Sequence, residues 1–178
     1  MYMSSLEQKV QAFKQQYYSK ETKSLFSSSA SKKFKCAQEV TNEFNLQELM
    51  CDSIFIVRDT CKIYVDYPKV KSFVNPNNYD AIRQHVFTLS ESILRTHPTF
   101  ELHINLQTFT VTAAQRYKDL ITLFCHQYLN TSAESEKLSL LYIHNTPKMV
   151  QVIQNMFSPF ISHSHKNKII LLKPEHKE

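Results

Sequence analysis

Residues 138–172 read LSLLYIHNTPKMVQVIQNMFSPFISHSHKNKIILL, and this stretch decides the fold. Its first segment, LSLLYI (138–143), is continuous enough in apolar residues to be a strand buried on both faces. Pro147 then begins a helical pattern that reaches Ile161, since proline costs no hydrogen bond at the first helical position. The segment KIILL (168–172) predicts the closing strand. A strand, a crossover helix and a second strand indicate parallel pairing with a right-handed connection.

The same alternation of strands and helices extends upstream. The segment ELHINL (101–106) alternates strictly, which places Leu102, Ile104 and Leu106 on one face of a strand. Helical patterns cover 77–96 and 110–129, and a polar loop is expected over 131–137. The runs IFIV (54–57) and KIYVDY (62–67) predict a hairpin. The sequence therefore predicts an α/β fold with a mainly parallel mixed sheet of about five strands, crossover helices and a gate-like last helix.

Two helices are predicted ahead of this sheet. Residues 4–19 place Leu6, Val10, Phe13 and Tyr17 at helical spacing, and a second helical pattern follows over 34–50. The serine-rich segment 24–33 between them indicates a hinge. We assign 1–50 to a basic helical N-terminal extension and 51–178 to the α/β domain, since 178 residues that are 42% hydrophobic fit one core.

Most of the net charge of +5 belongs to the N-terminal extension, because residues 1–40 hold seven lysines and three glutamates. A solvated helical face is one interpretation of these lysines. Peripheral contact with an anionic membrane is another, since aromatic residues are interleaved with them. Nucleic-acid binding is disfavoured because the charge does not extend over the domain. The candidate basic surface comprises Lys9, Lys14, Lys32, Lys33 and Lys35.

The chain contains no glycine, although about 7% is usual. Phosphate-binding P-loops, dinucleotide-binding GxGxxG turns and the GxSxG nucleophile elbow all require glycine, so none is present in its usual form. Left-handed backbone positions must then be filled by Asn or Asp. Asn130, just after a helical stretch, is a candidate for such a position.

The reactive residue types are not arranged for catalysis or for metal binding. Cys125 and His126 are neighbours on a predicted helix and project in different directions, which is poor geometry for a nucleophile and its base. His163 and His165 have no cysteine or carboxylate nearby at ligand spacing. We therefore expect no enzymatic activity, no metal and no cofactor.

The cellular location is inferred from what the chain lacks. The four cysteines are scattered, without the close spacing of a redox pair or a zinc site, which is typical of reduced core thiols. No apolar run approaches the roughly 20 residues of a membrane span, and the first residues lack the apolar stretch of a signal peptide. We expect a soluble cytoplasmic protein, with peripheral membrane contact left open.

The stretch 138–172 resembles the C-terminal half of a CRAL-TRIO domain, a family that binds hydrophobic ligands. The shared features are the apolar strand that ends at His144, then Pro147, then Ser158-Pro159-Phe160, and the basic loop before Ile169. Details around His144 and Pro159 favour the divergent, protein-binding BCH branch of that family. The resemblance extends over 54–172 and departs from the family where a glycine often follows the central strand and Gln107 and Thr108 stand here.

The resemblance implies that residues 147–161 form a gate over a hydrophobic cavity floored by the sheet. The apolar residues of this segment cover more than one side of a helix, so it needs a second apolar partner, which is a lipid, another protein or the N-terminal helix. On the central strand, His103 and Asn105 need partners, water or a ligand, with structural pairing favoured. The candidate ligand-binding or interaction residues are His103, Asn105, Tyr142, His144, Met149, Val150, Ile153, Phe157 and Phe160.

Two functions remain open at this point. The first is a non-enzymatic CRAL-TRIO-like module that binds a lipid or another hydrophobic ligand, or contacts a membrane. The alternative is a BCH-like protein-interaction scaffold that forms a homodimer or binds a small GTPase or its regulator.

Overall fold

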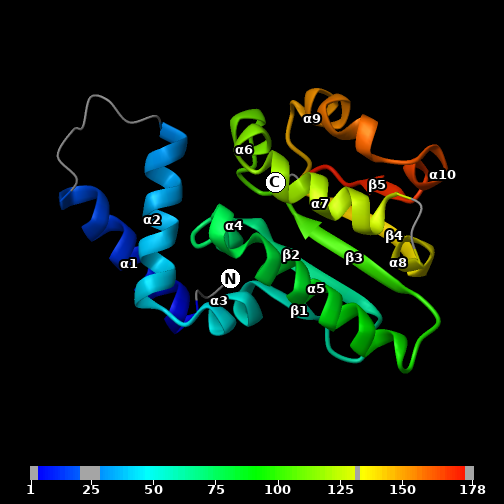
Figure 1. Ribbon diagram of the computed structural model, residues 1–178, viewed down its shortest axis with the longest axis horizontal. Coiled ribbons are helices and arrows are strands. Elements are labelled where there is room, and N and C mark those ends of the chain that lie inside the picture. Colours follow the sequence, from blue (N-terminus) through cyan, green and yellow to red (C-terminus); the bar gives the residue numbers. More distant parts are fainter. Residues whose placement is uncertain (1–3, 21–28, 131–132, 175–178) are drawn as a thin grey trace.

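A five-stranded mixed sheet forms the centre of the computed structural model, which describes residues 4–20, 29–130 and 133–174 (Figure 1). The strands lie in sequence order, β1-β2-β3-β4-β5. β1 pairs antiparallel with β2, and the three remaining pairs are parallel. The predicted fold class and the hairpin are confirmed. The strands are β1 (Ile54–Ile56), β2 (Lys62–Asp66), β3 (Phe100–Asn105), β4 (Leu138–His144) and β5 (Ile169–Leu171).

Three crossover helices lie on one side of the sheet, as Figure 1 shows: α5 (Tyr79–Leu94), α7 (Lys118–Tyr128) and α9 (Val150–Phe157). They bury apolar stripes toward the sheet, which include Ile82 and Val86 on α5 and Leu120 on α7. Shorter elements connect them: α4 (Tyr67–Val70), α6 (Val111–Arg116), α8 (Ala133–Lys137), α10 (His163–Lys166), and the 3₁₀ helices η1 (Pro76–Asn78) and η2 (Ser158–Phe160).

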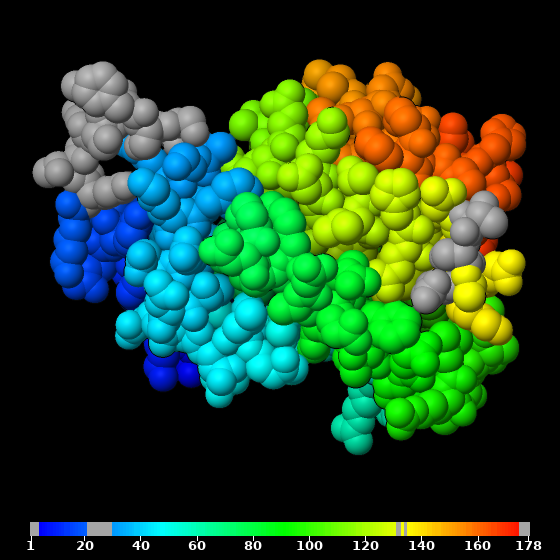
Figure 2. Space-filling model, viewed as in Figure 1, coloured from blue at the N-terminus to red at the C-terminus, as the bar shows by residue number. Residues whose placement is uncertain are grey.

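The N-terminal helices α1 (Ser5–Lys20), α2 (Ser29–Glu43) and α3 (Leu46–Ser53) belong to the same hydrophobic core. Val10 of α1 and Val40 of α2 are buried in it, and the rings of Phe13 and Phe44 meet edge to face at 5.8 Å. Figure 2 shows these helices, in blue and cyan, lying directly against the green part of the chain.

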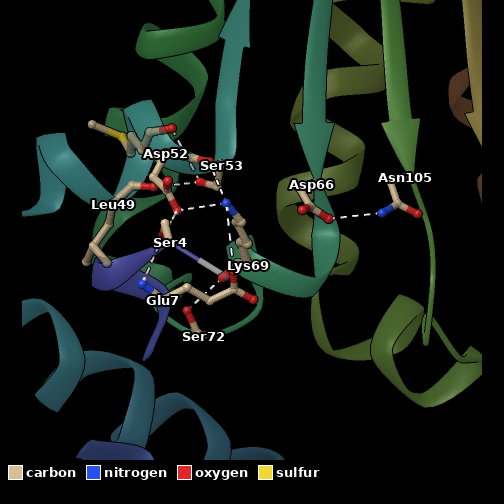
Figure 3. A network of polar contacts seen from close by, with 10 residues as sticks. Ser4, Glu7, Leu49, Asp52, Ser53, Asp66, Lys69, Ser72 and Asn105 are labelled. Carbon is tan, nitrogen blue, oxygen red and sulfur yellow. Dashed lines mark hydrogen bonds and ion pairs between the residues drawn. The ribbon is translucent and has the colours of Figure 1, made fainter. Parts of the chain in front are cut away.

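A polar network fixes α1 and α3 to α4 (Figure 3). The Lys69 ammonium group of α4 donates to the carboxylate of Asp52 at 2.9 Å and to the Asp52 carbonyl at 3.2 Å. The Glu7 carboxylate of α1 lies 4.0 Å from the same ammonium group, and the Ser4 hydroxyl donates to Asp52 at 3.3 Å. Lys69 therefore pairs with two carboxylates and donates to a carbonyl near the end of α3.

Several predicted boundaries are wrong for local reasons. The single helix predicted over 34–50 is two helices, because the Asn45 side chain accepts a hydrogen bond from the Glu48 amide and starts α3. The helix predicted over 110–129 breaks at Tyr117, whose φ and ψ are −99° and 19°. The last helix begins at Val150, because Pro147 forms a turn in which its carbonyl accepts from the Val150 amide at 3.0 Å.

Three other predictions about this part of the chain need correction. Residues 133–137, predicted as loop, form α8. β4 is fully buried only at Leu138 and Leu141, because no described helix covers the second face of the sheet. Of the predicted serine hinge, residues 29–33 are helical and 24–28 lie outside the described residues.

Three described residues have positive φ: Asp59 (58°), Thr108 (65°) and Asn145 (53°). Asp and Asn at such positions were expected in a chain without glycine. The prediction for Asn130 is wrong, since it is not among them; α7 ends at Tyr128, and its C-terminal cap is Leu129 with φ −127°. Thr108 was not expected, because a β-branched residue is strained in this conformation.

We expect Thr108→Gly to raise the free energy of unfolding by about 0.5 kcal/mol, because relief of the positive-φ strain outweighs the added chain entropy of glycine and the loss of the exposed hydrogen bond from Lys71. Urea unfolding monitored by circular dichroism measures the change. Gln107→Gly is the matched control, since Gln107 is an exposed neighbour without positive φ, and it should lower the free energy of unfolding by about 0.5 kcal/mol. Equal effects of the two substitutions would contradict backbone strain at Thr108.

Candidate functional site

A cavity of about 490 Å³ lies between the sheet and its helices. Its floor consists of the strand residues that point toward the helices, and its roof of apolar residues of α5, α7 and α9. Small-molecule sites in proteins commonly range from about 300 to 1,000 Å³, so the cavity is large enough for a ligand. The floor includes Val65, Leu102, Ile104, Leu141, Ile143 and Ile169, and the roof includes Ile82, Val86, Ile121, Phe124, Ile153 and Phe157.

Nearly all of the cavity wall is apolar, and its buried thiol and the phenol of Tyr67 are uncharged at neutral pH. Burial raises the pKa of the Cys125 thiol to about 11, so it is uncharged at neutral pH. Burial likewise raises the pKa of Tyr67 to about 12, with a smaller contribution from Tyr117. A wall of this kind has no groups that would pair with a buried charge, so it suits an apolar ligand.

The polar part of the wall is confined to one rim beside α9. Gln151 and Asn155 of α9 and Lys166 of α10 belong to the wall and are exposed to solvent, so the cavity reaches the surface there. The Lys166 ammonium group donates to the Ser158 hydroxyl at 3.1 Å, which bridges the two sides of the rim. The cavity is therefore apolar inside and polar at its opening beside α9.

The residues predicted on the last helix fall on different sides of it. Val150, Ile153 and Phe157 line the cavity. Met149 is 56% exposed, and Phe160 packs its ring against His126 of α7 at 5.8 Å rather than lining the cavity. Because Val152 is also 41% exposed, α9 is apolar on its outer side as well. α1, one partner considered for this helix, lies against α2 and well away from α9 in Figure 1.

The four predicted residues on the central strands lie on the opposite face of the sheet and do not line the cavity. The strand register aligns Tyr64 with His103 and His103 with Tyr142. The rings of His103 and Tyr142 stack at 4.5 Å, and Phe55 continues the row at 5.6 Å from Tyr64. This second face therefore carries an aromatic row that crosses four strands.

The polar residues of this second face are paired with one another. His103 contacts the Glu101 carboxylate through Nε2 and His144 Nε2 through Nδ1, both at 2.9 Å. Asn105 donates to the Asp66 carboxylate at 3.0 Å (Figure 3) and accepts from the Asn145 amide at 2.8 Å. The prediction that His103 and Asn105 have structural partners is confirmed.

We expect His144 to lower stability in mild acid. Burial and, to a smaller extent, the neighbouring His103 lower the pKa of His144 in the folded protein. The unfolded chain then binds the proton more readily, so the free energy of unfolding should fall as the pH drops through the unfolded value of about 6.5 and level off below the folded pKa. His144→Gln, which can still donate to His103, should flatten this part of the profile.

Urea unfolding between about pH 5 and pH 8 provides the measurement. His97→Gln replaces an exposed histidine and should keep the wild-type slope. If the stability difference between wild type and His144→Gln is the same at every pH, the proposed role of this side chain is wrong.

Residues 4–20, 29–130 and 133–174 lack two features. They contain no group of three or more His, Cys, Asp or Glu side chains placed to hold a metal ion. None of their helices is both long enough and apolar enough to cross a bilayer.

The fold and the cavity define the class: an α/β domain with an apolar cavity between one sheet face and its crossover helices, open to solvent beside α9. The CRAL/TRIO domain family matches residues 46–178, and the chain belongs to this family, whose members bind hydrophobic ligands such as lipids. The crystal structure of Sfh5 is similar, with a TM-score of 0.59 and 13% sequence identity, over 96% of this chain and 66% of the Sfh5 chain. At that identity the likeness shows the fold. No curated protein matches the chain.

Proposed function

We propose that this protein binds a lipid, or another hydrophobic ligand, in the cavity under α9. The observation that carries the proposal is the continuous apolar lining of a chamber of about 490 Å³ in a folded domain. Burial of an apolar chain there gains about 25 cal/mol for each Å² removed from water. The polar rim of Gln151, Asn155 and Lys166 suits the polar end of such a ligand.

The helix α9 is the proposed gate. It has eight residues and no side-chain N-terminal cap, and two buried residues, Ile153 and Phe157, anchor it toward the cavity. The exposed Met149, which lies at the N-cap position of α9, and the exposed Val152 provide an apolar outer surface for transient contact with a membrane while the ligand is exchanged. Displacement of α9 would open the chamber directly to that surface.

The same exposed pair favours a second candidate function. Met149 and Val152 form an apolar surface that a protein partner, a second copy of the chain, or a small GTPase or its regulator would cover. This is the BCH-like scaffold, and it does not require an occupied cavity.

Native mass spectrometry of the purified protein, with lipid extraction, tests the first function. A bound hydrophobic mass that is lost on organic extraction supports it. An empty protein that also fails to take up a fluorescent fatty acid or phospholipid contradicts it. Flotation with liposomes and light scattering then compare wild type with Met149→Asp and Val152→Asp. Loss of liposome binding assigns the outer surface to membranes, whereas conversion of a dimer to a monomer assigns it to the scaffold.

A further inference from the structure

Three lysines from separate elements converge where the N-terminal helices meet α4. Lys14 lies on α1, Lys33 on α2, and Lys71 directly follows α4. Aromatic contacts join α2 to α4 through Tyr117: Phe34, next to Lys33, meets the ring of Tyr117 at 5.8 Å, and Tyr67 of α4 meets the same ring at 6.3 Å. The 4.0 Å contact between Glu7 and Lys69 ties α1 to α4. Lys14 and Lys71 are partly buried, whereas Lys33 is exposed.

The positive charges of this cluster act on one another. Burial lowers the pKa of Lys14, and the charges of Lys71 and Lys33 lower it further, while Cys36 acts in the opposite direction. Burial also lowers the pKa of Lys71, with Lys33 as the second cause and Asp66 opposing both. Lys14 and Lys71 therefore lie in partly desolvated places where the charges of the neighbouring lysines make their positive charge less favourable.

Lys69, two residues before Lys71, shows how this protein neutralises a lysine elsewhere. Its ammonium group lies 2.9 Å from the Asp52 carboxylate and 4.0 Å from that of Glu7. Within the described parts of the chain, no carboxylate lies within 4.0 Å of the ammonium groups of Lys14, Lys33 or Lys71.

Neutral groups orient Lys71 instead. Its ammonium group donates to the Thr108 hydroxyl at 2.8 Å and lies 5.7 Å from the centre of the Tyr67 ring. Thr108 is one of the strained positive-φ residues, so the loop after β3 brings its hydroxyl here against its backbone preference. The cluster therefore combines one oriented donor, Lys71, with positive charge that Asp66, more than 4.0 Å away, offsets only in part.

We propose that Lys14, Lys33 and Lys71 form a binding site for a phosphate-bearing anion, at the junction of α1, α2 and α4. A phosphate group carries about two negative charges at neutral pH and several strong acceptor oxygens, so it can bridge donors that come from three directions. The exposure of Lys33 leaves the site open to solvent. This site is separate from the cavity and stands whether or not the cavity holds a lipid.

Inorganic phosphate is the first probe. We expect phosphate to raise the melting temperature of the full chain more than sodium chloride of equal ionic strength does, because it binds the folded state. Isothermal titration should show phosphate binding weakened about tenfold or more by each of Lys14→Gln, Lys33→Gln and Lys71→Gln, since each removes a charge-assisted hydrogen bond.

Two matched controls lie on the same helices. Lys9→Gln on α1 and Lys35→Gln on α2 remove exposed lysines of the same charge and should keep the wild-type response to phosphate. Lys14→Gln should also melt at or above the wild-type temperature without phosphate, because a partly buried repelling charge is gone. A structural role for Lys14 predicts the opposite shift. An absent phosphate response, or one that the controls lose equally, overturns the proposal.

Vesicles distinguish the source of the phosphate. Vesicles of phosphatidylcholine with a phosphoinositide carry accessible phosphate monoesters, whereas vesicles with phosphatidylserine carry comparable charge without them. Retention by phosphoinositide vesicles that Lys14→Gln and Lys71→Gln abolish, and Lys9→Gln does not, supports a lipid headgroup as the ligand. Binding of inorganic phosphate without vesicle retention supports a free anion.

Discussion

Replacing Ile143 with tryptophan should reduce the amount of bound hydrophobic ligand at least tenfold. Ile143 lies on β4 and its side chain forms part of the cavity floor. The indole ring would occupy space that is otherwise available to the ligand, and the chamber can accept the added volume at modest cost to stability. Quantification of extracted lipid per mole of protein, together with uptake of a fluorescent fatty acid, measures the effect.

Leu140→Trp provides the matched control, because Leu140 lies on the same strand with its side chain on the other face of the sheet. That variant should retain the wild-type amount of ligand. A melting temperature within a few degrees of wild type for both variants separates occlusion from unfolding. Equal ligand content in the two variants would show that the chamber is not where the ligand binds.

Replacing Lys69 with methionine should lower the free energy of unfolding by about 2 kcal/mol, since it leaves two partly buried carboxylates without their cation. The Lys69, Asp52 and Glu7 side chains are 22%, 29% and 25% exposed, so solvent screens these charges only in part. The substitution also removes the donor to the Asp52 carbonyl, which weakens the attachment of α3 to α4. Urea unfolding with fluorescence detection gives the value.

Lys62→Met is the corresponding control at a looser ion pair. In the wild type, the Lys62 ammonium group lies 3.9 Å from the Glu101 carboxylate, and the Lys62 side chain is 43% exposed. Surface pairs of this kind contribute about 0.5 kcal/mol or less. Comparable losses in the two variants would mean that the Lys69 network adds nothing beyond an ordinary surface contact.

The sequence contained enough information to predict the sheet. The alternation of Leu102, Ile104 and Leu106 identified the central strand and the face that meets the helices, because side chains alternate with a period of two. Helix breaks were harder to predict. The interruption at Tyr117 lies within an otherwise periodic apolar pattern, and the Tyr117 ring contacts Phe34 and Tyr67, which are distant from it in the sequence.

The lining of the cavity was predicted in part. The apolar spacing of α9 identified Val150, Ile153 and Phe157, all of which line the cavity. The strand residues of the cavity floor were not predicted. Polar residues such as His103, which need a partner or a ligand, lie on the opposite face of the sheet and were predicted instead. The alternation that placed Ile104 with the apolar set already contained the necessary signal. Lys71 was missed because its significance comes from Lys14 and Lys33, which are far from it in the sequence.

Tyr117 faces two parts of the molecule at once. Its ring belongs to the cavity wall, and it is also covered by Phe34 of α2. A truncated fragment that starts at residue 46, where the family match begins, would lose this cover together with the buried Val10 and Val40. Such a fragment would expose the back of the chamber wall to water, so recombinant versions intended for ligand work need the first two helices.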